Sequence, residues 1–105
     1  MTEVKFQRTR SDGLRVNFWI KHGDDDWRKL VFRNDKARAD LERGRAYTLF
    51  WQAFGKEGDG FTVKRKIEGV DSEFATLVDE WKIPDQPDIP PGVPLRFNAR
   101  QNFTL

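Results

Sequence analysis

The sequence predicts a mostly β protein: an antiparallel β-sandwich of about seven strands with one short helix before the last strand. Short segments in which apolar and polar residues alternate recur along the chain, and clusters rich in Gly, Asp, Asn and Ser separate them. One segment near the C-terminus instead repeats its apolar residues with a helical period. At 105 residues, the chain is expected to form a single domain, 1–105.

The N-terminal part contains three expected strands. Residues 3–9 alternate, and a turn at 10–13 leads to residues 14–21, in which every second residue is apolar. A second turn, rich in Asp, precedes the third strand at 27–33. Residues 34–44 are polar and irregular, so we expect at most one short strand or turn there.

The C-terminal part begins with the most strongly apolar strand, residues 46–54. The loop 55–60 contains three glycines and is expected to close a hairpin with a strand at 61–69. Residues 95–104 alternate again, which predicts the last strand.

The segment 71–81 breaks the alternating pattern. Its large apolar residues, Phe74, Leu77, Val78 and Trp81, fall at i, i+3, i+4 and i+7, which is one face of a helix. We therefore expect a short helix here, packed on a sheet face.

A proline-rich tether, 83–94, follows the expected helix. It contains all five prolines of the chain, which excludes a helix or a central strand and favours an extended connection. We expect it to carry the chain away from the helix, so that the last strand can rejoin a sheet.

Residues 41–55 contain Leu41, Gly44 and Tyr47, followed by alternating apolar residues. This spacing resembles the corner before the penultimate strand of immunoglobulin-like and fibronectin type III-like sandwiches. The resemblance implies that the Tyr47 ring packs in the core while its hydroxyl bonds a backbone group near residues 41–44. It implies no function, since such sandwiches host many. The chain departs from the family's pattern in lacking a Cys pair and in continuing past the expected last strand.

Composition excludes most catalytic chemistry. The chain has no Cys, and its one histidine, His22, lies in a polar turn where we expect it to be solvated. No glycine-rich phosphate loop is present. Asp24, Asp25 and Asp26 are the only candidate metal ligands, but consecutive side chains point apart on an extended chain. We therefore expect no enzyme activity, no cofactor and no metal.

Trp19 lies on the side of its expected strand that Arg15 and Asn17 mark as polar. Three explanations remain open. The helix 71–81 and the tether cover Trp19 or Phe50; the rings form an exposed platform for sugars or bases; or they form a homodimer seam.

Charge is distributed unevenly. Residues 70–93 carry six acidic residues and one basic residue, whereas the rest of the chain is basic. This favours docking of the acidic segment on the basic body as much as an acidic partner. Lys64 and Lys66 point outward from one expected strand, and Arg96 and Arg100 point outward from another. With Trp19 nearby, these cations could form a basic platform on which bases stack.

The sequence thus predicts a non-enzymatic binding or assembly module that acts through protein–protein contacts, with a protein partner or a second copy of the chain. A carbohydrate-binding module that uses exposed aromatic residues is the alternative, and a weak binder of single-stranded nucleic acid that uses a basic outer face is the second. The N-terminus has no apolar signal segment and no window is long enough to span a membrane, so a cytoplasmic location is the default expectation. The candidate ligand or partner face comprises Arg15, Asn17, Trp19, Lys64 and Lys66.

Overall fold

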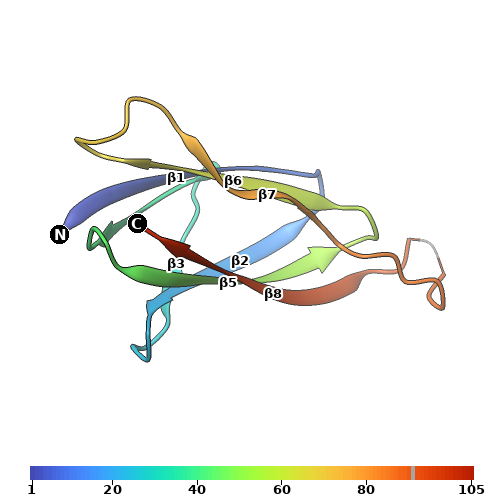
Figure 1. Cartoon of the computed structure of the whole chain (residues 1–105). Helices are drawn as coiled ribbons and strands as arrows, with labels where there is room; N and C mark the ends of the chain where they lie inside the picture. The colour runs from blue at the N-terminus through green and yellow to red at the C-terminus, as the bar shows by residue number, and fades with distance from the viewer. Residues whose placement is uncertain (91) are drawn as a thin grey trace.

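The computed structural model describes residues 1–90 and 92–105, which form two four-stranded antiparallel sheets packed face to face as a sandwich (Figure 1). We name them the β1 sheet, with strand order β4-β1-β6-β7, and the β2 sheet, with strand order β3-β2-β5-β8. Both termini lie at the same end of the sandwich (Figure 1). In chain order the strands are β1 (Thr2–Arg10), β2 (Arg15–His22), β3 (Arg28–Leu30), β4 (Lys36–Leu41), β5 (Ala46–Gly55), β6 (Gly60–Ile67), β7 (Ala75–Lys82) and β8 (Leu95–Thr104).

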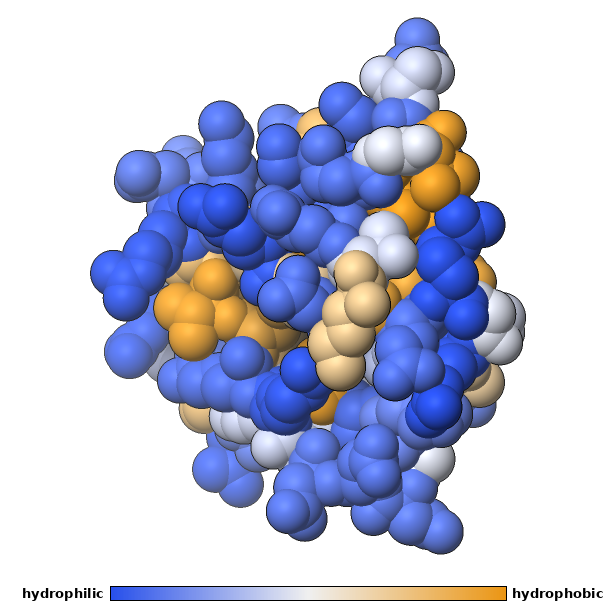
Figure 2. All heavy atoms as spheres, turned by 90° about the vertical axis from the view of Figure 1, so that its left-hand side faces the viewer, coloured by the Kyte–Doolittle hydropathy of each residue, from blue (hydrophilic) through white to orange (hydrophobic). Residues whose placement is uncertain are grey.

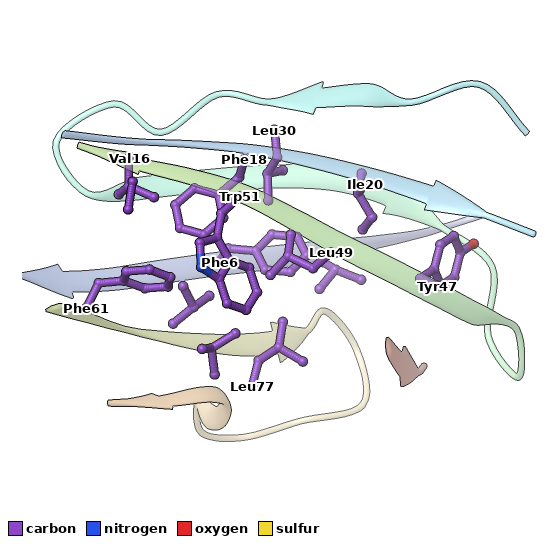
Figure 3. Close-up of a cluster of buried hydrophobic side chains, with 14 of the residues drawn as sticks. Phe6, Val16, Phe18, Ile20, Leu30, Tyr47, Leu49, Trp51, Phe61 and Leu77 are labelled. Carbon is purple, nitrogen blue, oxygen red and sulfur yellow. The ribbon is translucent and has the colours of Figure 1, made fainter. Parts of the chain in front are cut away.

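Alternation along the strands builds one core between the sheets. On β2, Val16, Phe18 and Ile20 are buried while the residues between them face outward. Trp51 from β5 lies at the centre of this core (Figure 3), with ring centroids 5.4 Å from Phe61 and 6.3 Å from Phe18. Large aromatic side chains therefore occupy the middle of the core, and aliphatic side chains from both sheets fill the rest.

The prediction of a hairpin at 55–60 is wrong, because β5 and β6 belong to different sheets. Alternation predicts both strands but cannot tell a hairpin from a loop that crosses between sheets. Gly60 is needed at this crossing, since a Cβ there would collide with the carbonyl oxygen of Trp81. The loop thus joins the two layers of the sandwich.

The prediction of a helix at 71–81 is also wrong. The segment forms β7, which pairs with β6, and the described residues contain eight strands and no helix, where about seven strands and a helix were expected. No helix of the described residues is long and apolar enough to cross a membrane.

β-bulges explain why β7 imitates a helical period. Phe61 and Val63 on β6 pair with Trp81 and Val78 on β7, so the β7 side contains one more residue than the β6 side. The register shifts again before Lys64, which pairs with Thr76. The first bulge puts two residues between the inward-facing Val78 and Trp81, so their spacing lengthens from two to three. At the second register shift, the adjacent residues Leu77 and Val78 are both buried.

Glu80 is the residue that accommodates the first bulge. Its φ is +42°, in the left-handed region that side-chain-bearing residues rarely adopt. Its backbone N–H donates to the Thr62 hydroxyl, with an N–O distance of 3.2 Å. The bulge is therefore held by a specific contact between β6 and β7.

The tether 83–94 starts anchored and ends in a sheet. The backbone N–H of Ile83 donates to the carbonyl oxygen of Asp59, 2.8 Å away, and the Ile83 side chain is buried. A turn bond from the Ile89 N–H to the Gln86 carbonyl shows that the segment is not fully extended. Pro91 lies outside the described residues. The chain rejoins the β2 sheet as β8, which pairs with β5, as expected.

The expected tyrosine corner is present. Tyr47 is buried, and the backbone N–H of Glu42 donates to its hydroxyl oxygen at 2.8 Å. The contact ties the β4–β5 loop to β5 and so connects the edge of the β1 sheet to the centre of the β2 sheet.

Candidate functional site

Trp19 lies in an aromatic cluster on the outer face of the β2 sheet. It pairs with Phe50 on β5, and the two ring centroids are 5.6 Å apart. Trp27, which is 40% exposed, contacts the same Phe50 ring at 5.6 Å. The described residues contain no helix that could lie over these rings, so the prediction that Trp19 or Phe50 sits beneath one is wrong.

Lysine side chains lie over both tryptophan rings. The Lys21 ammonium is 4.6 Å from the Trp27 ring centroid, and the Lys29 ammonium is 6.0 Å from that of Trp19. Such contacts are favourable because the face of an aromatic ring is electronegative. The rings are also tilted, by 42° between Trp19 and Phe50. The cluster therefore offers no set of parallel, unoccupied ring faces.

The strand register repeats one arrangement along the face. Lys29, Trp19, Phe50 and Arg100 form a single row across β3, β2, β5 and β8. A second row, four residues away along β2, also places an aromatic residue between cations. In this row Phe54 on β5 lies between Arg15 on β2 and Arg96 on β8.

Between these two rows lies a row of three amide side chains, contributed by Asn17, Gln52 and Asn98. The face therefore combines apolar rings, hydrogen-bonding amides and cations.

We call this surface the aromatic–cationic face. The face comprises the outward-facing side chains of the described residues of the four strands, together with the residue that precedes β3. None of these side chains is a carboxylate. The face is therefore positively charged and partly apolar. Its members are Arg15, Asn17, Trp19, Lys21, Trp27, Lys29, Thr48, Phe50, Gln52, Phe54, Arg96, Asn98, Arg100 and Asn102.

The structure divides the residues predicted for the site. Arg15, Asn17 and Trp19 lie together on the aromatic–cationic face. Lys64 and Lys66 project from β6 on the outer face of the opposite sheet. The two groups belong to two separate surfaces, on either side of the core.

The Asp residues of the β2–β3 loop, Asp24, Asp25 and Asp26, are exposed. Among residues 1–90 and 92–105, no group of three or more His, Cys, Asp or Glu side chains is placed to hold a metal ion. His22 lies beside the loop, with its Nδ1 atom 2.7 Å from the Ala46 carbonyl oxygen and its ring 5.6 Å from that of Tyr47. These contacts connect β2 to β5.

Two carboxyl groups have shifted pKa values. The Arg8 guanidinium donates to Asp35 at 2.8 Å and, with Arg10 at 3.2 Å, holds the pKa of Asp35 below its usual range. A hydrogen bond with the Asp85 side chain raises the pKa of Glu57. Neither group lies on the aromatic–cationic face.

Sequence patterns did not predict several residues of this face. Lys29 and Arg100 join Trp19 only through strand pairing, which places β3 beside β2 and β8 beside β5. Trp27, which precedes β3, joins the cluster through its contact with Phe50. The one available signal was that Arg96 and Arg100 alternate with the apolar residues of the last strand.

The end of the sandwich that carries both termini has a different character. Figure 2 shows that its hydrophobic surface consists of separate patches among hydrophilic side chains. Comparisons of the chain with protein-family models, with curated proteins and with solved structures found no match. The sheet faces therefore provide the basis for a proposal about function.

Proposed function

We propose that this protein is a non-enzymatic binding module that recognises an acidic protein surface through its aromatic–cationic face. The observation that carries the proposal is the row Lys29–Trp19–Phe50–Arg100, in which two adjoining aromatic rings lie between cations. Tryptophan and arginine are the residues most enriched at the energetic centres of protein interfaces. Carboxylates on a partner would pair with the cations while apolar side chains contact the rings.

The ring geometry argues against carbohydrate as the ligand. A sugar stacks its flat face on an aromatic ring, whereas ammonium groups already lie over Trp19 and Trp27. The tilt of 48° between Trp27 and Phe50 also prevents the rings from acting as one flat surface.

Charge argues against self-association through this face. A symmetric dimer would bring two identical surfaces together. Each carries Arg15, Lys21, Lys29, Arg96 and Arg100 with no carboxylate among the described side chains that share the face. Burying like charges opposite one another is costly, so an acidic partner fits better.

We also propose that the scaffold is immunoglobulin-like. The support is the two-sheet antiparallel architecture together with the buried Tyr47 and its bond to the Glu42 amide. The bulged β7 and the tether before β8 are additions to that plan.

Selection from a random peptide library tests the proposed function. The expected peptides combine carboxylates with apolar residues, and Trp27→Ala should weaken their binding by about tenfold or more. Lys66→Gln, on the opposite sheet, is the matched control and should leave binding unchanged. Peptides that bind Trp27→Ala and Lys29→Glu variants as well as the wild type would refute the assignment of this face.

A further inference from the structure

A second cationic surface lies on the outer face of the β1 sheet. Arg38, Lys5 and Lys66 are directly opposite one another on β4, β1 and β6, at neighbouring-strand distances of about 5 Å. Like charges in such a row repel one another and destabilise the sheet. This arrangement is therefore unfavourable unless something negative lies over it.

Carboxylates of the chain neutralise only part of this row. Lys5 contacts Glu68 at 3.1 Å, and Arg38 contacts Glu3 at 3.6 Å. Within the described residues, no carboxylate oxygen lies within 4.0 Å of the side-chain nitrogens of Arg33, Lys36 or Lys66. These three cations remain available to an external anion.

The same residues line an open cleft of about 760 Å³. We call it the cationic cleft; its lining includes Lys5, Arg33, Lys36, Arg38, Lys66 and Phe74. Its volume lies within the range of ligand-binding pockets.

An aromatic ring is part of the cleft lining. Phe74 is 38% exposed, and within the described part of the chain it stacks with no other aromatic ring and lies under no cation. It differs in this respect from Trp19 and Trp27, whose rings are in contact with Phe50 and with lysines. The Phe74 ring is free to stack with a flat ligand.

We propose that the cationic cleft binds single-stranded nucleic acid, with Arg33, Lys36 and Lys66 contacting phosphates and Phe74 stacking on a base. Cations along a groove together with an exposed aromatic ring are the two features that such binding uses. Gln7 is the only amide or hydroxyl side chain among the described residues that line the cleft, so base edges are hardly read and binding is independent of sequence. This site is separate from the aromatic–cationic face and does not depend on its function.

Salt dependence gives the proposal a quantitative form. If the cleft neutralises about three to four phosphates of a single strand, the logarithm of the observed binding constant should fall linearly with the logarithm of the salt concentration. The expected slope is about −2 to −3. Binding should therefore be measurable near 50 mM NaCl and largely lost by 200 mM.

Fluorescence anisotropy of a labelled oligo(dT) with the full-length protein tests this site. Lys66→Gln should weaken binding several-fold at 50 mM NaCl and reduce the magnitude of the slope by about 0.7. Phe74→Ala should weaken binding by about tenfold at every salt concentration and leave the slope unchanged. Lys36→Gln provides a second cleft variant, and Lys66→Arg, which keeps the charge, should bind as the wild type does.

Lys29→Gln is the matched control, because it makes the same charge change on the opposite sheet and should leave affinity and slope unchanged. An equal loss in Lys29→Gln and Lys66→Gln would mean that net charge alone drives binding and would overturn the proposal. Absence of binding at 50 mM NaCl would also overturn it. A third outcome would also overturn it: a poly-glutamate peptide displaces the labelled oligo(dT) as effectively as unlabelled oligo(dT) does, and Phe74→Ala has no effect. The cleft would then accept any polyanion.

Discussion

The outer faces of the two sheets are both basic, but they arrange their cations differently. On the β2 sheet, aromatic rings separate the cations, as Trp19 and Phe50 separate Lys29 from Arg100. On the β1 sheet, Arg38, Lys5 and Lys66 adjoin one another directly. A cation beside a ring is already stabilised, whereas adjacent cations need counter-charge, which Glu68 and Glu3 supply only to Lys5 and Arg38. Two basic faces can therefore suit different ligands, and we propose an acidic protein surface for the first and single-stranded nucleic acid for the second.

The sheets also differ in regularity. The strands of the β2 sheet pair in continuous register, so each outer residue has a defined neighbour on the next strand. In the β1 sheet, bulges interrupt the pairing of β6 with β7. Regular pairing gives the aromatic–cationic face its repeated rows, whereas irregular pairing at β7 bends the edge of the opposite sheet.

The largest expected loss of stability distinguishes the core side of the β2 sheet from its outer side. Trp51→Ala removes the central ring of the core and should lower the free energy of unfolding by about 3–5 kcal/mol. Trp27→Ala on the outer side should lower it by less than about 1 kcal/mol, because that ring is already 40% exposed. Urea denaturation followed by circular dichroism measures both. Equal losses would show that the outer aromatic cluster is a second core and not a binding surface.

The next prediction concerns the bulge at the edge of the β1 sheet. Glu80→Val places a β-branched residue at a φ of +42° and should destabilise the protein by roughly 1–2 kcal/mol. Asp79→Val changes the adjacent exposed residue in the same way, without the positive φ, and should stay within about 0.5 kcal/mol of the wild type. Thermal melts of the two variants provide the comparison. A reversed order would contradict the positive φ assigned to Glu80.

Tyr47 tests the connection between the two sheets. Tyr47→Phe leaves the ring in the core but removes the acceptor of the Glu42 amide, which should cost about 1 kcal/mol. Urea midpoints at constant slope measure this loss. An unchanged midpoint would mean that water replaces the hydroxyl at no cost and that the corner does not hold β4 to β5.

Sequence patterns predicted much of the fold because strand alternation and turn residues are local signals. Residues 14–21, 46–54 and 95–104 are strands as expected, and the Tyr47 corner is confirmed. The prediction for residues 71–81 failed because the bulges of β7 leave Val78 and Trp81 three residues apart and bury Leu77 next to Val78, which matches the apolar spacing of a helix. A bulge depends on the pairing of two strands, which the local sequence does not record.

The candidate site was only partly predictable for the same reason. Trp19 is conspicuous because it occupies the polar side of its strand, and this is visible in the sequence. Its partners Lys29 and Arg100 come from other strands through the register. Alternation along the strand also predicts that Lys66 points outward, but it does not indicate to which sheet the strand belongs. The predicted face therefore includes both Lys66 and Trp19.

The smallest expected effect concerns the turn that borders the cationic cleft. Asp35 lies between Arg33 and Lys36 in the sequence, but its carboxylate bonds Arg8 and Arg10 and so does not neutralise these two cleft cations. Asp35→Asn keeps a side chain that tolerates the local φ of +60° and removes only the charge.

Because these groups are partly exposed, solvent screening limits the expected loss to about 0.5 kcal/mol at pH 7. The bond with Arg8 lowers the pKa of Asp35, so the stabilisation is fully present above the unfolded value of about 3.9 and is lost as the pH falls through the lower folded-state value. The stability difference between the wild type and Asp35→Asn, measured by urea denaturation, should therefore shrink toward zero by about pH 2. A difference that persists at that pH would show that the turn is held by backbone geometry, with no contribution from the charge of Asp35.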